Sequence, residues 1–142
     1  MTRNLMIFFK KYFIALFIVL VFDFLWLLVI MNEFYNNQLS AFASHEVFPL
    51  WSGLLAWSLI PLGIVLFVDK ISDSYKKQFI YGAVYGFILY GLYEFTNYAI
   101  LGDWPLLVVF VDVLWGIFLC STTAVLFQYV YNGFFVKSAK NL

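Results

Sequence analysis

The sequence predicts an all-α integral membrane protein, a bundle of four transmembrane helices with both termini in the cytoplasm. Its 142 residues are 65% hydrophobic and only 11% charged, with a mean hydropathy of +0.93. A soluble domain of this size needs far more polar surface. The apolar residues also gather into four runs without lysine or arginine, at about 12–31, 49–68, 78–101 and 105–131.

The first run indicates a transmembrane helix that is retained in the protein. Basic residues precede it, as they precede a signal peptide, but it has about the 20 residues that span a hydrocarbon core, and no small-residue cleavage pattern follows. Backbone polar groups in hydrocarbon must pair within their own segment, so each run is expected to form a helix. We expect the four helices to form a single membrane domain over residues 1–142.

Three connections of unequal length join the expected helices. They are a polar loop, a short charged loop and a tight turn, at 32–48, 69–77 and 102–105. In the turn, Gly102 and Asp103 are typical turn residues, and Trp104 suits a membrane boundary. Pro105 suits the first position of the next helix, where its missing N–H does no harm.

The cationic residues predict the orientation. All eight fall on one side of a four-span arrangement: Arg3, Lys10, Lys11, Lys70, Lys76, Lys77, Lys137 and Lys140. By the positive-inside rule, both termini then face the cytoplasm. A three-span arrangement would instead put the lysines between the second and third runs on the opposite side from those near the C-terminus.

Three of the eight acidic residues, Asp23, Glu94 and Asp112, lie inside the predicted spans. Each is seven or eight residues from the outer end of its span, which at about 1.5 Å of rise per residue is about 10–12 Å below the outer boundary. Glu94 is nine residues before Asp103 and Asp112 is nine after it, so an antiparallel hairpin brings both to one height. The three acids are therefore expected to be level.

The neighbours of these acids follow helical spacing, which predicts three stripes that face one another. The stripe on the third span contains Gly82, Gly86, Tyr90, Glu94 and Asn97. The fourth span contributes Asp112, Trp115, Gly116, Leu119 and Thr123, and the first contributes Asp23, Trp26 and Leu27. Facing stripes would enclose a small chamber that holds three acids, Asn97, Tyr90 and two indoles.

The acids recur in two similar stretches, DFLW at 23–26 and DVLW at 112–115, with tryptophan three residues after each aspartate. Three carboxylates at one depth cannot all stay ionised without a counter-ion, so protons must be held or shared, or a cation must enter. An indole N–H can donate to a carboxylate, and its ring face attracts cations. The alternative is that the acids serve only as hydrogen bonds between helices, although one asparagine would do so at lower cost.

Other chemistry has little support. The lone cysteine, Cys120, excludes an intrachain disulfide and a multi-cysteine metal centre, and the lone histidine, His45, excludes a two-histidine haem site. His45 and Glu46 together could bind a metal ion, but a lone histidine in a loop is usually only solvated. No basic run or Gly-rich loop indicates nucleic-acid or nucleotide binding. We therefore expect no metal, no cofactor and no nucleic-acid partner.

Two long stretches resemble a known family. They are FDFLWLLVIMNEFYNNQL at 22–39 and YEFTNYAILGDWPLLVVFVDVLWG at 93–116. Together they resemble the bacterial membrane proteins catalogued as domain of unknown function 2177. The matching positions are Asp23, Trp26, Tyr93 to Asn97, Trp104, Pro105, Val111, Asp112, Trp115 and Gly116, with Glu94 standing where the family pattern has aspartate. The resemblance implies a four-helix protein of the bacterial inner (cytoplasmic) membrane and no established activity.

Three functions compete. The first is a proton- or cation-coupled carrier in the lipid bilayer, acting as a homo-oligomer. Its titrating pair would be Glu94 and Asp112, with Asp23 as third ligand, Asn97 and Tyr90 as orienting donors, and Trp26 and Trp115 as aromatic walls. The second is an enzyme or accessory component of membrane-lipid modification that uses paired carboxylates, which is less favoured because no nucleophile or metal set accompanies them. The third is a non-catalytic structural or sensor subunit.

Overall fold

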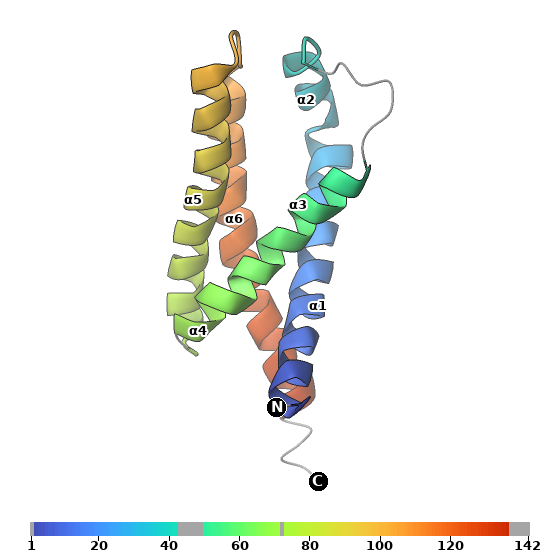
Figure 1. Cartoon of the computed structure of the whole chain (residues 1–142), viewed down its shortest axis with the longest axis vertical. Coiled ribbons are helices and arrows are strands. Elements are labelled where there is room, and N and C mark those ends of the chain that lie inside the picture. The colour runs from blue at the N-terminus through green and yellow to red at the C-terminus, as the bar shows by residue number, and fades with distance from the viewer. Residues whose placement is uncertain (1, 43–49, 72, 137–142) are drawn as a thin grey trace.

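The structure is a computed structural model that describes residues 2–42, 50–71 and 73–136. These residues form helices and short turns, with no strand among them. The order is α1 (Thr2–Leu25), η1 (Trp26–Ile30), α2 (Asn32–Gln38), α3 (Leu50–Gly63), η2 (Ile64–Val68), α4 (Asp69–Ile71), α5 (Tyr75–Ile100), α6 (Leu106–Tyr131) and η3 (Asn132–Val136) (Figure 1). The elements marked η are single π-helical turns that continue a neighbouring helix. The predicted all-α class is confirmed.

Three helical stretches in the described part of the chain are long and apolar enough to cross a membrane. They are Arg3–Ile30, Leu50–Ile71 and Leu106–Phe135. The sequence also predicted a span at 78–101, and α5 covers it as a continuous helix of 26 residues. Its tyrosines, glycines and Glu94 lower its mean hydropathy, so α5 does not qualify by length and composition alone.

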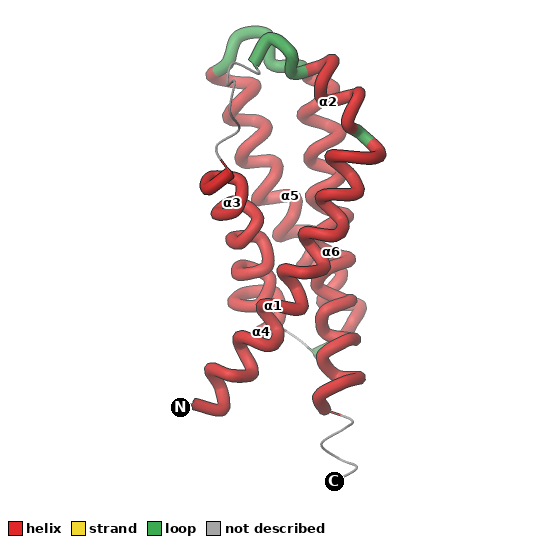
Figure 2. The backbone as a smooth tube through the Cα atoms, turned by 90° about the vertical axis from the view of Figure 1, so that its right-hand side faces the viewer, coloured by secondary structure: helices red, strands yellow, loops and turns green. Residues whose placement is uncertain are grey.

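The most extensive helix–helix packing in the bundle is between α5 and α6, which run antiparallel and side by side (Figures 1 and 2). Small residues bring the two backbones together. A Cβ atom added to Gly86 would lie 2.1 Å from the carbonyl oxygen of Gly116, and one added to Gly82 would lie 2.7 Å from that of Cys120. The stripe expected on the third span therefore packs on α6 at its inner part, as small residues do between transmembrane helices.

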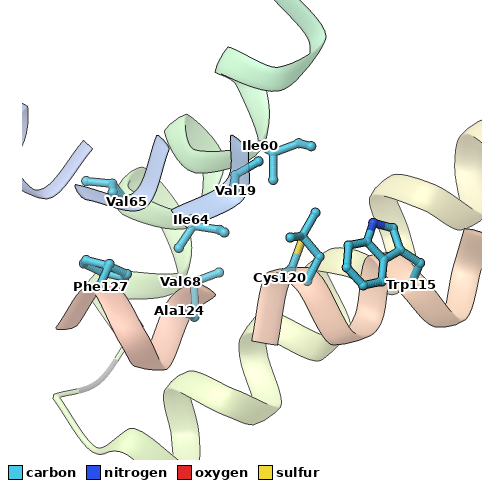
Figure 3. Close-up of a cluster of buried hydrophobic side chains, with 11 residues drawn as sticks. Val19, Ile60, Ile64, Val65, Val68, Trp115, Cys120, Ala124 and Phe127 are labelled. Atoms are coloured by element: carbon cyan, nitrogen blue, oxygen red, sulfur yellow. The ribbon is translucent and has the colours of Figure 1, made fainter. Parts of the chain in front are cut away.

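The core of the bundle lies where α1 and η2, which continues α3, pack on α6, and its side chains are drawn in Figure 3. Val19, Ile64 and Phe127 are fully buried there. Large apolar side chains also cover the outside, and Phe17 and Leu92 are about 70% exposed. An apolar exterior around an apolar core is what a lipid environment requires.

The first connection differs from the expected loop. Residues 32–38 form α2, and an apolar cluster follows helical spacing through it and the next turn: Phe34, Tyr35, Leu39 and Phe42. This cluster packs on Trp104, which precedes α6, and on Val108 and Val109 in the first turn of α6. The prediction of a loop at 32–38 was wrong because the polar residues between these apolar positions dominate the local composition. His45 and Glu46 lie outside the described residues.

The end of the bundle at which α1 begins contains an ion pair between Lys11 on α1 and Asp69 on α4. The Lys11 Nζ lies 2.8 Å from Asp69 Oδ2, and the Asp69 side chain is only 4% exposed. The start of α1 and the turn η3 lie at this same end (Figures 1 and 2), where Lys11 also lies over the Tyr131 ring. The ion pair therefore joins two helices next to both described ends of the chain.

Replacing Lys11 by methionine is expected to lower the free energy of unfolding by about 2 kcal/mol. Methionine keeps an aliphatic chain but leaves the buried Asp69 carboxylate without its counter-ion. The expected loss is smaller than for a fully buried ion pair, because the Lys11 side chain is 19% exposed to solvent. The matched control is Lys10→Met, which removes only a cation–π contact with Phe135 and should cost less than about 1 kcal/mol. Denaturant unfolding in detergent micelles measures both, and equal losses would contradict the assignment.

Candidate functional site

Asp23 on α1, Glu94 on α5 and Asp112 on α6 come together where these three helices meet. Asp23 is 3% exposed, Glu94 is fully buried and Asp112 is partly buried. Glu94 and Asp112 are direct neighbours, and Asp23 lies within electrostatic reach of Asp112. We call Asp23, Glu94 and Asp112 the carboxyl layer. The three acids that the sequence singles out are therefore neighbours in the structure.

Each acid in the carboxyl layer accepts a hydrogen bond from a neutral aromatic donor. The Trp115 indole nitrogen donates to Asp23 Oδ1 at 2.8 Å, and the Trp104 indole nitrogen donates to Glu94 Oε2 at 2.9 Å. The third donor is the Tyr35 hydroxyl, which donates to Asp112 Oδ1. Among the described residues, no lysine or arginine pairs with any of the three acids. The layer is therefore bound by neutral groups and carries no compensating positive charge.

Each tryptophan of the repeated motifs is linked to the aspartate of the other motif. Trp115, from DVLW, serves the aspartate of DFLW across the helix contact. Trp26, from DFLW, donates to the Tyr35 hydroxyl at 3.0 Å and so reaches Asp112 only through Tyr35. The two indole rings stack, with centroids 4.2 Å apart and planes 4° from parallel. The sequence placed each tryptophan on its own aspartate's face, and the packing of α1 against α6 pairs it with the other helix instead.

Tyr35 is a site residue that the sequence analysis missed. It stands on α2, accepts from Trp26 and donates to Asp112, so it connects the outer helix to the carboxyl layer. Burial raises the pKa of the Tyr35 hydroxyl above its usual value, and the bond to Asp112 raises it further. The phenol therefore stays protonated and keeps donating. The helical spacing of the apolar residues in 34–42 was the available signal.

Trp104 is the second donor whose role the sequence did not reveal. It was expected at the membrane boundary in the turn, and instead it is 8% exposed and bonded to Glu94. The Phe42 ring covers it, with centroids 5.1 Å apart. Trp104 and Tyr35 thus occupy part of the space that the stripes were expected to leave as a chamber.

The segment that carries these contacts matches a protein family described as "Predicted membrane protein (DUF2177)", over residues 8–129. The chain belongs to this family. The resemblance carried by the two quoted stretches is confirmed, and the match contains the whole carboxyl layer and its three donors. The description of DUF2177 names no activity. No curated protein and no solved structure matches the chain.

The two remaining polar candidates of this DUF2177 protein lie near the layer without bonding to it. Tyr90 packs its ring on Gly116, where a Cβ atom would meet a ring carbon at 2.2 Å. Asn97 is partly exposed on the outer part of α5. Among the described residues, neither side chain donates a hydrogen bond to an acid, so the expected role of orienting donor falls in this structure to Tyr35, Trp104 and Trp115.

In the turn between α5 and α6, Gly102 and Asp103 are turn residues as expected, and only the place of Pro105 departs from expectation. Asp103, with a φ of 63°, takes the left-handed conformation, whereas Gly102 does not have a positive φ. Pro105 precedes α6 with extended backbone angles instead of forming its first helical residue. Asparagine and aspartate tolerate the left-handed region better than other non-glycine residues, which explains why aspartate occupies this position.

Two further observations bear on what the layer can hold. The described residues contain no group of three His, Cys, Asp or Glu side chains arranged to hold a metal ion. Glu94 Oε1 is buried and has no hydrogen-bond partner among them. A buried acceptor without a donor costs about 1–3 kcal/mol of stability. A proton shared between the neighbouring carboxyl groups of Glu94 and Asp112 would supply a donor at this site.

Replacing Trp115 by phenylalanine is expected to lower the free energy of unfolding by about 2 kcal/mol. The substitution keeps an aromatic ring but leaves the buried Asp23 carboxyl without its donor. The control is Trp57→Phe, because Trp57 also packs against an aromatic ring, that of Phe24, and its indole nitrogen makes no hydrogen bond within the described chain. Thermal unfolding in detergent should separate the two variants. Equal losses would mean that the bond to Asp23 contributes nothing.

Proposed function

We propose that the protein binds and exchanges protons, or a small cation, at the carboxyl layer and acts as a carrier-like membrane protein. The observation that carries the proposal is that three acids meet inside the bundle with only neutral donors around them. Intramembrane acids are costly, and a purely structural hydrogen bond needs none of them. Their negative charge must be neutralised by a bound proton or cation.

Glu94 and Asp112 are the proposed exchanging pair. Their side chains are neighbours, and Glu94 Oε1 lacks a donor that a shared proton would supply. Asp23 is the third member, fixed by Trp115. Gain or loss of a proton changes the charge of the layer, and a change in charge favours one conformation of the bundle over another. A change in the charge of the layer would act on α2 through Tyr35, which donates to Asp112 from that helix.

The proposal includes a four-span topology, in which α5 is a fourth span beside the three apolar helical stretches. Its 26 residues extend about 39 Å at about 1.5 Å each, enough to cross a bilayer core. It is antiparallel to α6, and its polar residues face the bundle or the boundary instead of forming a charged surface. Lys76 and Lys77 at its start favour a cytoplasmic inner end, with both termini on that side of a bacterial inner membrane. Lys137 and Lys140, which support the same orientation, lie outside the described residues.

A homo-oligomer is part of the proposal. Four helices are few for a path across the membrane, and a second copy would bring two carboxyl layers into one assembly. The apolar exterior of α5, where Leu92 is 70% exposed, offers a surface for this contact within the bilayer.

Flux in reconstituted liposomes tests the function. The wild-type protein, reconstituted under a proton gradient or a gradient of one alkali cation, should dissipate the gradient faster than empty liposomes. The double variant Glu94→Gln with Asp112→Asn should fall to the empty-liposome rate, because amides keep the shapes but exchange no protons. The control is Glu33→Gln, which removes an exposed acid on α2 and should leave flux unchanged. Wild-type flux no greater than that of the double variant would refute the proposal.

A further inference from the structure

An apolar groove runs along the outer half of the contact between α1, η1 and α6. Its volume is about 600 Å³, and it is lined by nine residues, all of them apolar or aromatic. Phe22 and Phe118, whose rings pack edge to face, form part of the lining. Leu114 also lines it and is 66% exposed on the side that would face lipid. The volume falls in the range of binding sites for small organic molecules.

The stacked indoles of Trp26 and Trp115 form the wall between this groove and the carboxyl layer. Both belong to the lining of the groove, and both direct their N–H groups away toward the acids. Trp115 donates to Asp23, and Trp26 donates to Tyr35, which donates to Asp112. The groove therefore borders two electron-rich indoles, one of which donates to a carboxyl group directly and the other through Tyr35.

We infer that the groove binds a lipophilic organic cation, with its apolar body among the aliphatic and aromatic side chains and its positive charge against the Trp26–Trp115 pair. The inference rests on the proposed function, because it takes the carboxyl layer as the counter-charge. A cation near an indole face is attracted by the ring, and the attraction is stronger when water is excluded. The nearby acids add a Coulomb term that a low-dielectric surrounding preserves.

Charge complementarity selects this occupant over a neutral one. A lipid acyl chain would fill the apolar volume equally well, but it would gain nothing from Asp23 and Asp112 behind the indoles. A lipophilic cation uses both parts of the site. It also dissolves in the bilayer and so reaches the groove from the lipid side, where Leu114 forms the rim.

Equilibrium binding of tetraphenylphosphonium to the purified protein in detergent tests the inference. The anion tetraphenylborate, of almost the same shape, is the matched probe. Wild-type protein should bind the cation at least about tenfold more tightly than the Leu114→Trp variant, whose larger side chain fills the groove. Leu107→Trp, at a position of α6 that is 56% exposed and does not line the groove, should bind as wild type does. Circular dichroism and melting temperature check that both variants fold.

The charge requirement is tested with Asp23→Asn, whose amide oxygen still accepts from Trp115. This variant should bind tetraphenylphosphonium about tenfold more weakly, whereas tetraphenylborate, which the carboxylate repels, should bind no more weakly than it does to the wild type. Equal binding of both probes, or equal binding by wild type and Leu114→Trp, would overturn the inference and leave an acyl chain as the occupant. Binding is measured without flux, so the carrier proposal is tested separately. Binding without proton flux would refute only the carrier, and flux without binding would refute only the groove.

Discussion

Replacing Gly86 by alanine is expected to force α5 away from α6 and to lower the free energy of unfolding by about 3 kcal/mol. The new Cβ atom would lie 2.1 Å from the Gly116 carbonyl oxygen and 2.6 Å from the carbonyl carbon. These are backbone atoms in the middle of a helix, so no side-chain rotation can relieve the contact. The helices must separate along the contact that positions Glu94 opposite Asp112.

Gly102→Ala is the control for this prediction. A Cβ atom at Gly102 meets nothing within 4 Å, and its φ is not positive, so alanine should change stability by less than about 0.5 kcal/mol. Melting temperature in one detergent compares the two variants. If Gly86→Ala melts with the wild type, α5 and α6 are not packed as closely as the structure has them.

Much of the helical frame follows from the sequence because membrane helices obey simple rules. Apolar runs of sufficient length predicted the long helices, and the spacing of Gly82 and Gly86 predicted the face of α5 that meets α6. That Glu94 and Asp112 are neighbours also followed from geometry, since the rise per residue and a tight turn place them opposite each other in the hairpin. These features depend on one helix or one hairpin, which a single sequence specifies well.

The rest of the site depends on contacts between distant segments, which the sequence does not encode in a local pattern. Tyr35 reaches Asp112 only because α2 folds over the end of α6, 77 residues away. Trp115 and Trp26 lie where helix spacing predicts, yet their partners are set by how α1 and α6 cross. Tryptophan is common at membrane interfaces, so the sequence alone does not identify Trp104 as a donor. Its role follows from its hydrogen bond to Glu94 and from the Phe42 ring that covers it.

Replacing Glu94 by glutamine is expected to separate stability from activity. The amide oxygen can still accept from Trp104, and the amide nitrogen replaces Oε1, the buried acceptor that has no donor. The amide N–H can then donate to Asp112, and one costly ionisable group leaves the bundle. We expect the free energy of unfolding to rise by about 1 kcal/mol.

Flux through the same variant should fall to the empty-liposome rate, because the amide can neither take up nor release a proton. Parallel measurements of melting temperature and flux on one preparation therefore test what Glu94 is for. Glu33→Gln, the exposed acid on α2, should change neither quantity. When a residue is retained for function at a cost in stability, its replacement raises stability and lowers activity. A Glu94→Gln protein that melts lower and keeps its flux would make Glu94 a packing residue and would remove it from the exchanging pair.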